Sequence, residues 1–259
     1  MRNLAMAFCL WIFALPAAGQ EPVRHDADRP EPVGEESGEP DLGVSPIRWM
    51  WDLRGGLFLP EIDSEFGGAA TPYADIFGND QKMAWRTELS WQFYRGIGSL
   101  GVGTDLGLFY RSGKALLEDG TKSGDGTSFV LIPMGLKLVY RFDWLQTTYH
   151  FPLTPYGKAG LVYNFWWITD GDGSVATWGT GDGGGKARGG TYGWEVALGL
   201  SLLLDFFDSD SAANLERESG INNSYIFVEW MYNKSDNFGE DGALRVGGAA
   251  WMFGLGVEF

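Results

Sequence analysis

The chain has 259 residues, including 39 glycines and 12 tryptophans, and a formal net charge of −15 at neutral pH. This negative charge argues against nucleic acid as a partner, because neutralising phosphates requires a basic surface. A mean hydropathy of −0.13 excludes a bundle of membrane-spanning helices, and the many glycines and aromatic residues favour an all-β barrel over an α/β enzyme.

The first 19 residues are expected to be a secretory signal peptide. Arg2 supplies the positive charge, 4–15 is an apolar run, and 16–19 offers small residues for cleavage. The apolar run is too short for a comfortable transmembrane helix. The chain's one cysteine, Cys9, lies within this run, so we expect a mature protein without thiol chemistry or disulfides.

Residues 20–47 are rich in proline, glutamate and aspartate and hold almost no large apolar side chains. Such a segment cannot bury enough surface to offset its chain entropy, so we expect a disordered acidic tail in the periplasm. A linker is favoured over a docking segment. His25 lies in this tail and is expected to be solvated.

From residue 48 onward the sequence alternates between apolar and polar residues with the period of two that is typical of strands. Eight segments do so, at about 48–60, 83–94, 98–111, 128–142, 156–168, 192–206, 224–233 and 244–259. An open sheet edge in lipid would leave backbone groups unsatisfied. The pattern therefore predicts an all-β fold over 48–259, a closed eight-stranded antiparallel transmembrane β-barrel.

Alternation alone does not decide which face of the strands points out of the barrel, because a soluble lipocalin-like barrel would turn its apolar face inward. An apolar face without charges in 128–142 and 192–206 favours lipid outside. Aromatic residues also lie near segment ends, as in interface girdles; they include Trp49, Trp85, Tyr110, Phe142, Trp194 and Tyr232.

The opposite face carries charges of both signs, which are expected to pair inside a narrow barrel. An eight-stranded barrel is just wide enough for side chains to fill, so a salt-bridged plug is favoured over a pore. The candidate interior charges are Asp52, Arg54, Arg86, Glu88, Asp105, Lys137, Arg141, Lys158, Glu195, Glu229 and Glu258.

The connections predict the topology. With the N-terminus in the periplasm, the longer connections should lie outside the cell, and they fall at about 61–82, 112–127, 169–191 and 234–243. The periplasmic connections fall at about 95–97, 143–155 and 207–223. Capping signals predict a short helix over 209–218.

Enzyme chemistry is not expected. His150, the one histidine beyond the tail, falls in a predicted periplasmic turn, away from loop acids such as Asp75 and Asp80. The loop 169–191 holds Asp170, Asp172 and Asp182 among glycines, but its spacing is not that of a calcium loop. A flexible surface loop is favoured over a calcium site, and no metal or cofactor is expected.

Several motifs occur in order along 48–259. They are Phe58–Gly67, Ile76–Gly78, Val139–Asp143, Pro155–Leu161, Gly193-Trp194, Leu204-Asp205, Gly220–Asn222 and the ending at Phe259. Together they resemble an uncharacterised family of outer-membrane β-barrels best represented in myxobacteria and related bacteria. The resemblance implies an outer-membrane barrel, and it carries no assigned catalytic or ligand residues.

We therefore expect a non-catalytic outer-membrane β-barrel with a structural or surface-interaction role. The alternatives are a small pore for ions or small solutes, and a soluble lipocalin-like binder of an apolar ligand. The expected partners are outer-membrane lipid and, during assembly, the barrel-insertion machinery. Phe259, an aromatic residue in the apolar register at the end of the chain, would be the insertion signal.

Overall fold

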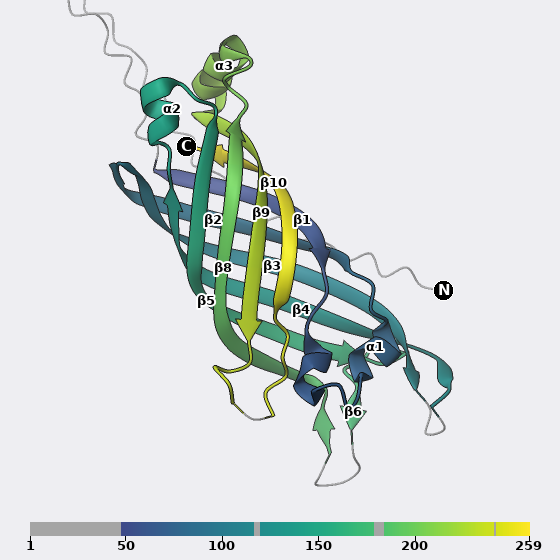
Figure 1. Cartoon of the computed structure of the whole chain (residues 1–259). Coiled ribbons are helices and arrows are strands. Elements are labelled where there is room, and N and C mark those ends of the chain that lie inside the picture. The colour runs from purple at the N-terminus through teal and green to yellow at the C-terminus, as the bar shows by residue number, and fades with distance from the viewer. Residues whose placement is uncertain (1–47, 117–119, 179–183, 241) are drawn as a thin grey trace, which may run out of the picture. The chain divides into compact units, whose positions relative to one another are not determined.

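The computed structural model describes residues 48–116, 120–178, 184–240 and 242–259. The expected signal peptide and acidic tail lie outside these residues. Eight antiparallel strands close into a barrel in the order β1-β10-β9-β8-β5-β4-β3-β2 (Figure 1). Their bounds are β1 Trp49–Phe58, β2 Lys82–Gly96, β3 Gly98–Leu116, β4 Lys122–Arg141, β5 Leu153–Thr169, β8 Arg188–Leu203, β9 Asn223–Ser235 and β10 Gly248–Glu258. The predicted fold class is confirmed.

The barrel is closed by its first and last strands. β1 pairs with β10 from Met50 opposite Glu258 to Leu57 opposite Trp251. Beyond β10, Phe259 and Trp49 exchange two backbone hydrogen bonds of 2.9 Å. This closure leaves no strand edge in the barrel wall unpaired. The side chain of Phe259 is exposed at this seam, and its role as an insertion signal stays a prediction.

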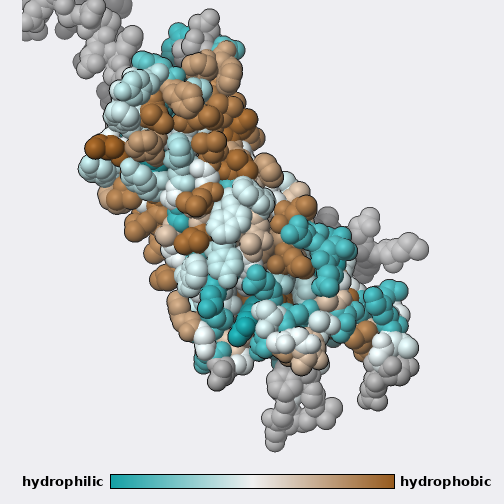
Figure 2. All heavy atoms as spheres, in the orientation of Figure 1, coloured by the Kyte–Doolittle hydropathy of each residue, from teal (hydrophilic) through white to brown (hydrophobic). Residues whose placement is uncertain are grey.

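The apolar face of the strands points outward. Trp51 on β1 and Leu136 on β4 are 43% and 55% exposed, whereas the neighbouring Asp52 and Lys137 are each 2% exposed. Figure 2 shows apolar side chains over the strands and hydrophilic ones gathered toward the end that carries α1 and β6. The predicted lipid-facing orientation is confirmed, and the lipocalin-like alternative, which requires the opposite facing, is wrong.

Outward aromatic residues form two belts separated by aliphatic side chains, as expected for the two membrane interfaces. The belt near the chain termini includes Trp49, Trp91 and Tyr140. The belt near the other end includes Trp85, Tyr110, Trp194, Tyr232 and Trp251.

The connections at the end away from the termini are partly structured. Between β1 and β2 lie a 3-10 helix, η1 Ile62–Phe66, and a short helix, α1 Pro72–Phe77. Between β5 and β8, the two-residue strands β6 Thr177–Trp178 and β7 Gly185–Lys186 pair with each other. The predicted loop 112–127 is wrong in part, because β3 and β4 continue through most of it as a protruding hairpin.

The connections at the other end are a tight turn and two helices. Gly98 in the β2–β3 turn has φ +95°, and a side chain there would lie 2.5 Å from the Arg141 carbonyl oxygen. Helix α2 Trp144–Tyr149 follows β4, and helix α3 Ser209–Ser219 follows β8. The predicted helix over 209–218 is confirmed. No helix in the described part of the chain is both long and apolar enough to cross a membrane.

Candidate functional site

The candidate site is the barrel interior, and its centre is a row of carboxylates. The strand register puts Asp52 of β1 opposite Glu88 of β2, and Glu88 opposite Asp105 of β3. Like charges on directly opposed residues are destabilising. Such a row inside a narrow barrel therefore requires cations from the surrounding strands.

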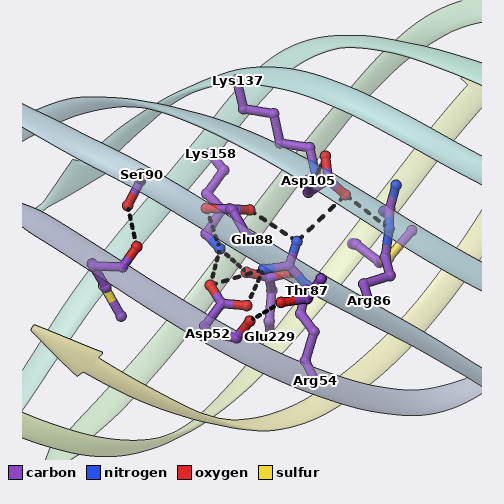
Figure 3. Close-up of polar contacts among 12 residues, drawn as sticks. Asp52, Arg54, Arg86, Thr87, Glu88, Ser90, Asp105, Lys137, Lys158 and Glu229 are labelled. Atoms are coloured by element: carbon purple, nitrogen blue, oxygen red, sulfur yellow. Dashed lines mark hydrogen bonds and ion pairs between the residues drawn. The ribbon is translucent and has the colours of Figure 1, made fainter. Parts of the chain in front are cut away.

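Two cations enter this row from different sides of the barrel (Figure 3). Arg54 of β1 lies with Nη2 2.9 Å from Glu88 Oε2 and Nη1 3.2 Å from Asp52 Oδ1. Lys158 of β5 places Nζ 3.0 Å from Glu88 Oε1, 3.2 Å from Glu229 Oε2 and 3.3 Å from Asp52 Oδ2. Each cation thus contacts several carboxylates. Glu229 adds a carboxylate from β9 that contacts both cations.

Two further cations extend the network toward the other end of the barrel. Arg86 Nε lies 3.0 Å from Asp105 Oδ2, and Lys137 Nζ lies 3.0 Å from Asp105 Oδ1. Both cations also contact the carboxylate of Glu195 on β8. The central ion-pair cluster consists of Asp52, Arg54, Arg86, Glu88, Asp105, Lys137, Lys158, Glu195 and Glu229, and each of these side chains is at most 4% exposed.

A second polar layer lies at the end near the chain termini. Arg141 pairs with Glu258 across 3.6 Å and stacks over the ring of Tyr225, 4.7 Å from its centroid. Glu258 also accepts hydrogen bonds from Tyr225, Asn223 and Gln92 at 2.9, 2.9 and 3.1 Å. This layer satisfies the last of the predicted interior charges and closes the barrel below the central cluster.

An apolar plug fills the opposite half of the interior. Phe58 and Phe109 pack edge to face at 5.4 Å, and Phe129 packs against Tyr73 of α1 at 5.8 Å. The other buried members include Phe77, Leu131, Met231, Val246 and Met252. The connection between β1 and β2 therefore contributes side chains to the core and covers this mouth of the barrel.

Polar contacts fix this covering segment in place. Arg111 of β3 donates from Nε to the Phe77 carbonyl at 2.6 Å and also to the Asp80 carbonyl. Asp63 accepts the backbone N–H groups of Tyr73 and Ala74 at 2.8 and 2.9 Å, and so caps α1 from outside the helix. Burial raises the pKa of the Tyr73 phenol well above its usual value, so this group stays neutral.

The interior leaves little free volume. A cavity of about 20 Å³ lies beside Arg86, Asn164 and Met231, which is room for about one water molecule. The described side chains of the three layers are otherwise buried against one another.

All eleven predicted interior charges lie in the barrel, nine of them in the central cluster and two in the layer of Arg141 and Glu258. Sequence reasoning missed the partners that are not charged. Tyr225 and Gln92 hold Glu258, and Asn164, Ser235 and Asn233 form a chain of hydrogen bonds of 2.6 Å each. Their inward positions in the alternating pattern were the sequence signal that could have identified them.

The loop residues considered for chemistry do not converge. Ser174 donates its N–H to Asp172 at 2.8 Å and its hydroxyl to Asp170 at 3.0 Å, and the first of these bonds lowers the pKa of Asp172. Asp182 lies outside the described residues. Among those described, no three His, Cys, Asp or Glu side chains gather as a metal site would require. His150 is exposed at the end of α2.

No protein-family model and no curated protein matches the sequence. Among solved structures, the chain is similar to Neisserial surface protein A, with 14% identity, a TM-score of 0.42 and coverage of 82% of this chain and 97% of that one. It is also similar to the outer membrane protein OprG from Pseudomonas aeruginosa, with 14% identity, a TM-score of 0.40 and coverage of 82% and 97%. It is similar as well to the N-terminal β-barrel domain of Pseudomonas aeruginosa OprF, with 12% identity, a TM-score of 0.38 and coverage of 82% of this chain and 98% of that one. At this identity no activity, ligand or partner carries over to this chain.

Proposed function

We propose that this protein is a sealed, non-catalytic β-barrel of the outer membrane, with a structural role and a loop surface outside the cell. The observation that carries the proposal is the pairing of an apolar outer wall with an interior filled by ion pairs. An apolar outer wall is stable in lipid, and a closed barrel satisfies its backbone groups there.

The filled interior favours a structural role over transport. The side chains of Arg54, Glu229 and Asp105 meet in the middle of the lumen with no measurable exposure. A solute would have to displace several ion pairs, and each cation so released would stay buried without a partner. We therefore place any interaction of this protein at its loops and its outer surface.

The proposal also includes how the chain is exported and how the barrel is inserted. Residues 1–19 would direct the chain through the inner membrane and be removed, and residues 20–47 would remain as a periplasmic tail. The support is the charged, apolar and small-residue sequence of the leader and the acidic composition of the tail. The barrel-insertion machinery would then deliver the barrel to the outer membrane.

Fractionation followed by a heat-modifiability gel tests this proposal. Isolated outer membranes should contain the protein, and unboiled samples should migrate differently from boiled ones, because a closed barrel resists SDS until it is heated. Recovery of the protein in the soluble periplasm, with no difference between boiled and unboiled samples, would show the proposal to be wrong.

A further inference from the structure

The signs of the outward-facing charges follow a pattern. Along the described strands of the barrel, outward positions hold four charged residues, Lys114, Lys122, Arg188 and Lys234. All four are cations, all are exposed, and all lie at the end that carries the loops. No carboxylate occupies an outward position on these strands. In a chain with 34 acidic and 19 basic residues, this distribution runs against the overall charge.

Two of these cations lie beside outward-facing tryptophans. Arg188 of β8 is the cross-strand partner of Trp167 of β5, and Lys234 of β9 is the partner of Trp194 of β8. Lys234 pairs with Asp236 at 3.5 Å but keeps half of its side chain exposed. Exposed ion pairs of this kind are weak, so the ammonium remains able to bind a second acceptor.

The neighbouring loops do not share the positive charge. The connection 59–81 between β1 and β2 contains five acidic residues and no lysine or arginine, and the connections 170–187 and 235–247, which adjoin Arg188 and Lys234, each contain three acidic residues and one basic residue. An anion that approaches from water meets this acidic surface, whereas an anion held in the membrane interface meets the cations on the wall. Charge complementarity therefore favours a partner that comes from the membrane side.

We infer that two of these outward cations, Arg188 and Lys234, form a basic rim that binds the phosphate groups of phosphorylated lipids in the outer leaflet, whereas Lys114 and Lys122 lie farther out on the protruding hairpin of β3 and β4. The inference rests on the proposed outer-membrane location. Long basic side chains extend their charged ends to the headgroup level while their stems cover apolar surface. The adjoining tryptophans lie at the same interface and pack against the lipid.

The test measures binding of lipid A with both of its phosphates to the folded protein in a zwitterionic detergent. Native mass spectrometry counts the bound lipid. Lipid A stripped of its phosphates and inorganic phosphate are the comparison probes. The wild-type protein should retain the phosphorylated lipid more strongly than the stripped one, and inorganic phosphate should not compete at equal concentration.

The variant Arg188→Gln/Lys234→Gln should bind the phosphorylated lipid about 25-fold more weakly, since each cation near a membrane surface contributes about fivefold. Lys82→Gln is the matched control, because Lys82 is an exposed lysine at the same end of β2 but in the inward register. It should bind like the wild type.

Equal retention of the phosphorylated and stripped lipids by the wild type would overturn the inference, and so would an equal loss in Lys82→Gln. Effective competition by inorganic phosphate would assign the rim to free anions and also overturn it. The heat-modifiability gel separates these outcomes from failure of the proposed function, because it reports whether each protein is a folded barrel. If the double variant does not fold, the inference is tested by the wild-type protein alone, through the comparison of its binding to phosphorylated and to stripped lipid A.

Discussion

At the scale of single residues, the central ion-pair cluster is stable only as a complete set. Arg54 contacts Asp52, Glu88 and Glu229, so its removal would leave three carboxylates facing one another with Lys158 alone between them. Breaking a buried ion pair costs about 3–5 kcal/mol. We expect Arg54→Met to lower the free energy of unfolding by about that amount, measured by denaturant titration of the folded barrel in detergent.

Arg95→Met provides the control for this prediction. Arg95 is exposed near the β2–β3 turn and donates a hydrogen bond to Gln92. Its replacement should change the free energy of unfolding by less than about 0.5 kcal/mol. Similar losses in the two variants would mean that the cluster contributes no more than an exposed arginine does.

Gly135 is needed because a carboxylate occupies the space where its side chain would be. A Cβ at this inward position would lie 2.0 Å from Asp105 Oδ1, whereas a Cβ added at Gly124 on the same strand would meet no non-neighbouring atom within 4 Å. Gly135→Ala should therefore displace Asp105 and destabilise the barrel by about 1–3 kcal/mol. Gly124→Ala should be neutral, and a thermal scan of the heat-modifiable form compares the two. Equal melting of the two variants would contradict the packing argument.

Leu136 tests the facing of the wall. It is 55% exposed within the apolar outward row 130–140 of β4, so Leu136→Arg places a charge in lipid and should cost about 2–4 kcal/mol. Leu116→Arg is the matched control, because Leu116 is also exposed and outward but lies at the end of the protruding hairpin. Refolding yields into lipid vesicles measure both. If arginine is tolerated equally well at the two positions, the membrane does not reach Leu136.

The interior residues could be predicted from alternation, but their partners could not. A period of two places Asp52, Glu88 and Lys158 on the same face of their strands. The stagger between strands decides that Asp52 and Glu88 lie side by side and that Lys158 reaches both from across the lumen. That stagger is a property of the closed barrel, and no single segment of the sequence contains it.

At the scale of elements, helix α1 depends on a residue outside it. A helix of six residues is too short to be stable alone, and the carboxylate of Asp63 caps its first turn. Asp63→Ala should loosen the cap by about 1 kcal/mol. We expect faster hydrogen exchange over 59–81 and unchanged exchange in the strands. Glu65→Ala, which changes a neighbouring acid in η1, should leave both unchanged. Unaltered exchange in Asp63→Ala would show that packing alone holds α1.

The strands within the membrane were predictable and the elements at the loop end were not. In lipid every strand must carry an apolar face, so alternation marks its length. Beyond the membrane, β3 and β4 continue through Ser112, Gly113, Gly126 and Thr127, where water replaces lipid and no apolar face is required. Helix α3 was predictable because its capping signals are local, whereas α1 depends on Asp63 and on packing against Phe129.

At the scale of the whole molecule, the barrel is closed by two barriers that are independent of each other. The apolar plug under α1 fills one half, and the central ion-pair cluster fills the middle. Removing the plug should therefore not open a path. We expect no current steps from the wild type in planar bilayers, and none from Tyr73→Ala/Phe77→Ala, which strips α1 of its buried rings. A porin in the same bilayers serves as the positive control.

The same recordings distinguish a structural barrel from the pore alternative. Steps of current from wild-type protein that is folded on the heat-modifiability gel would show that the cluster opens in the membrane. Current from the double variant alone would show that the plug is the true barrier and that the ions beneath it let water through. Silence from both, with the porin active, supports a barrel closed at its centre, because Arg54 and Lys158 remain in place when the plug is gone.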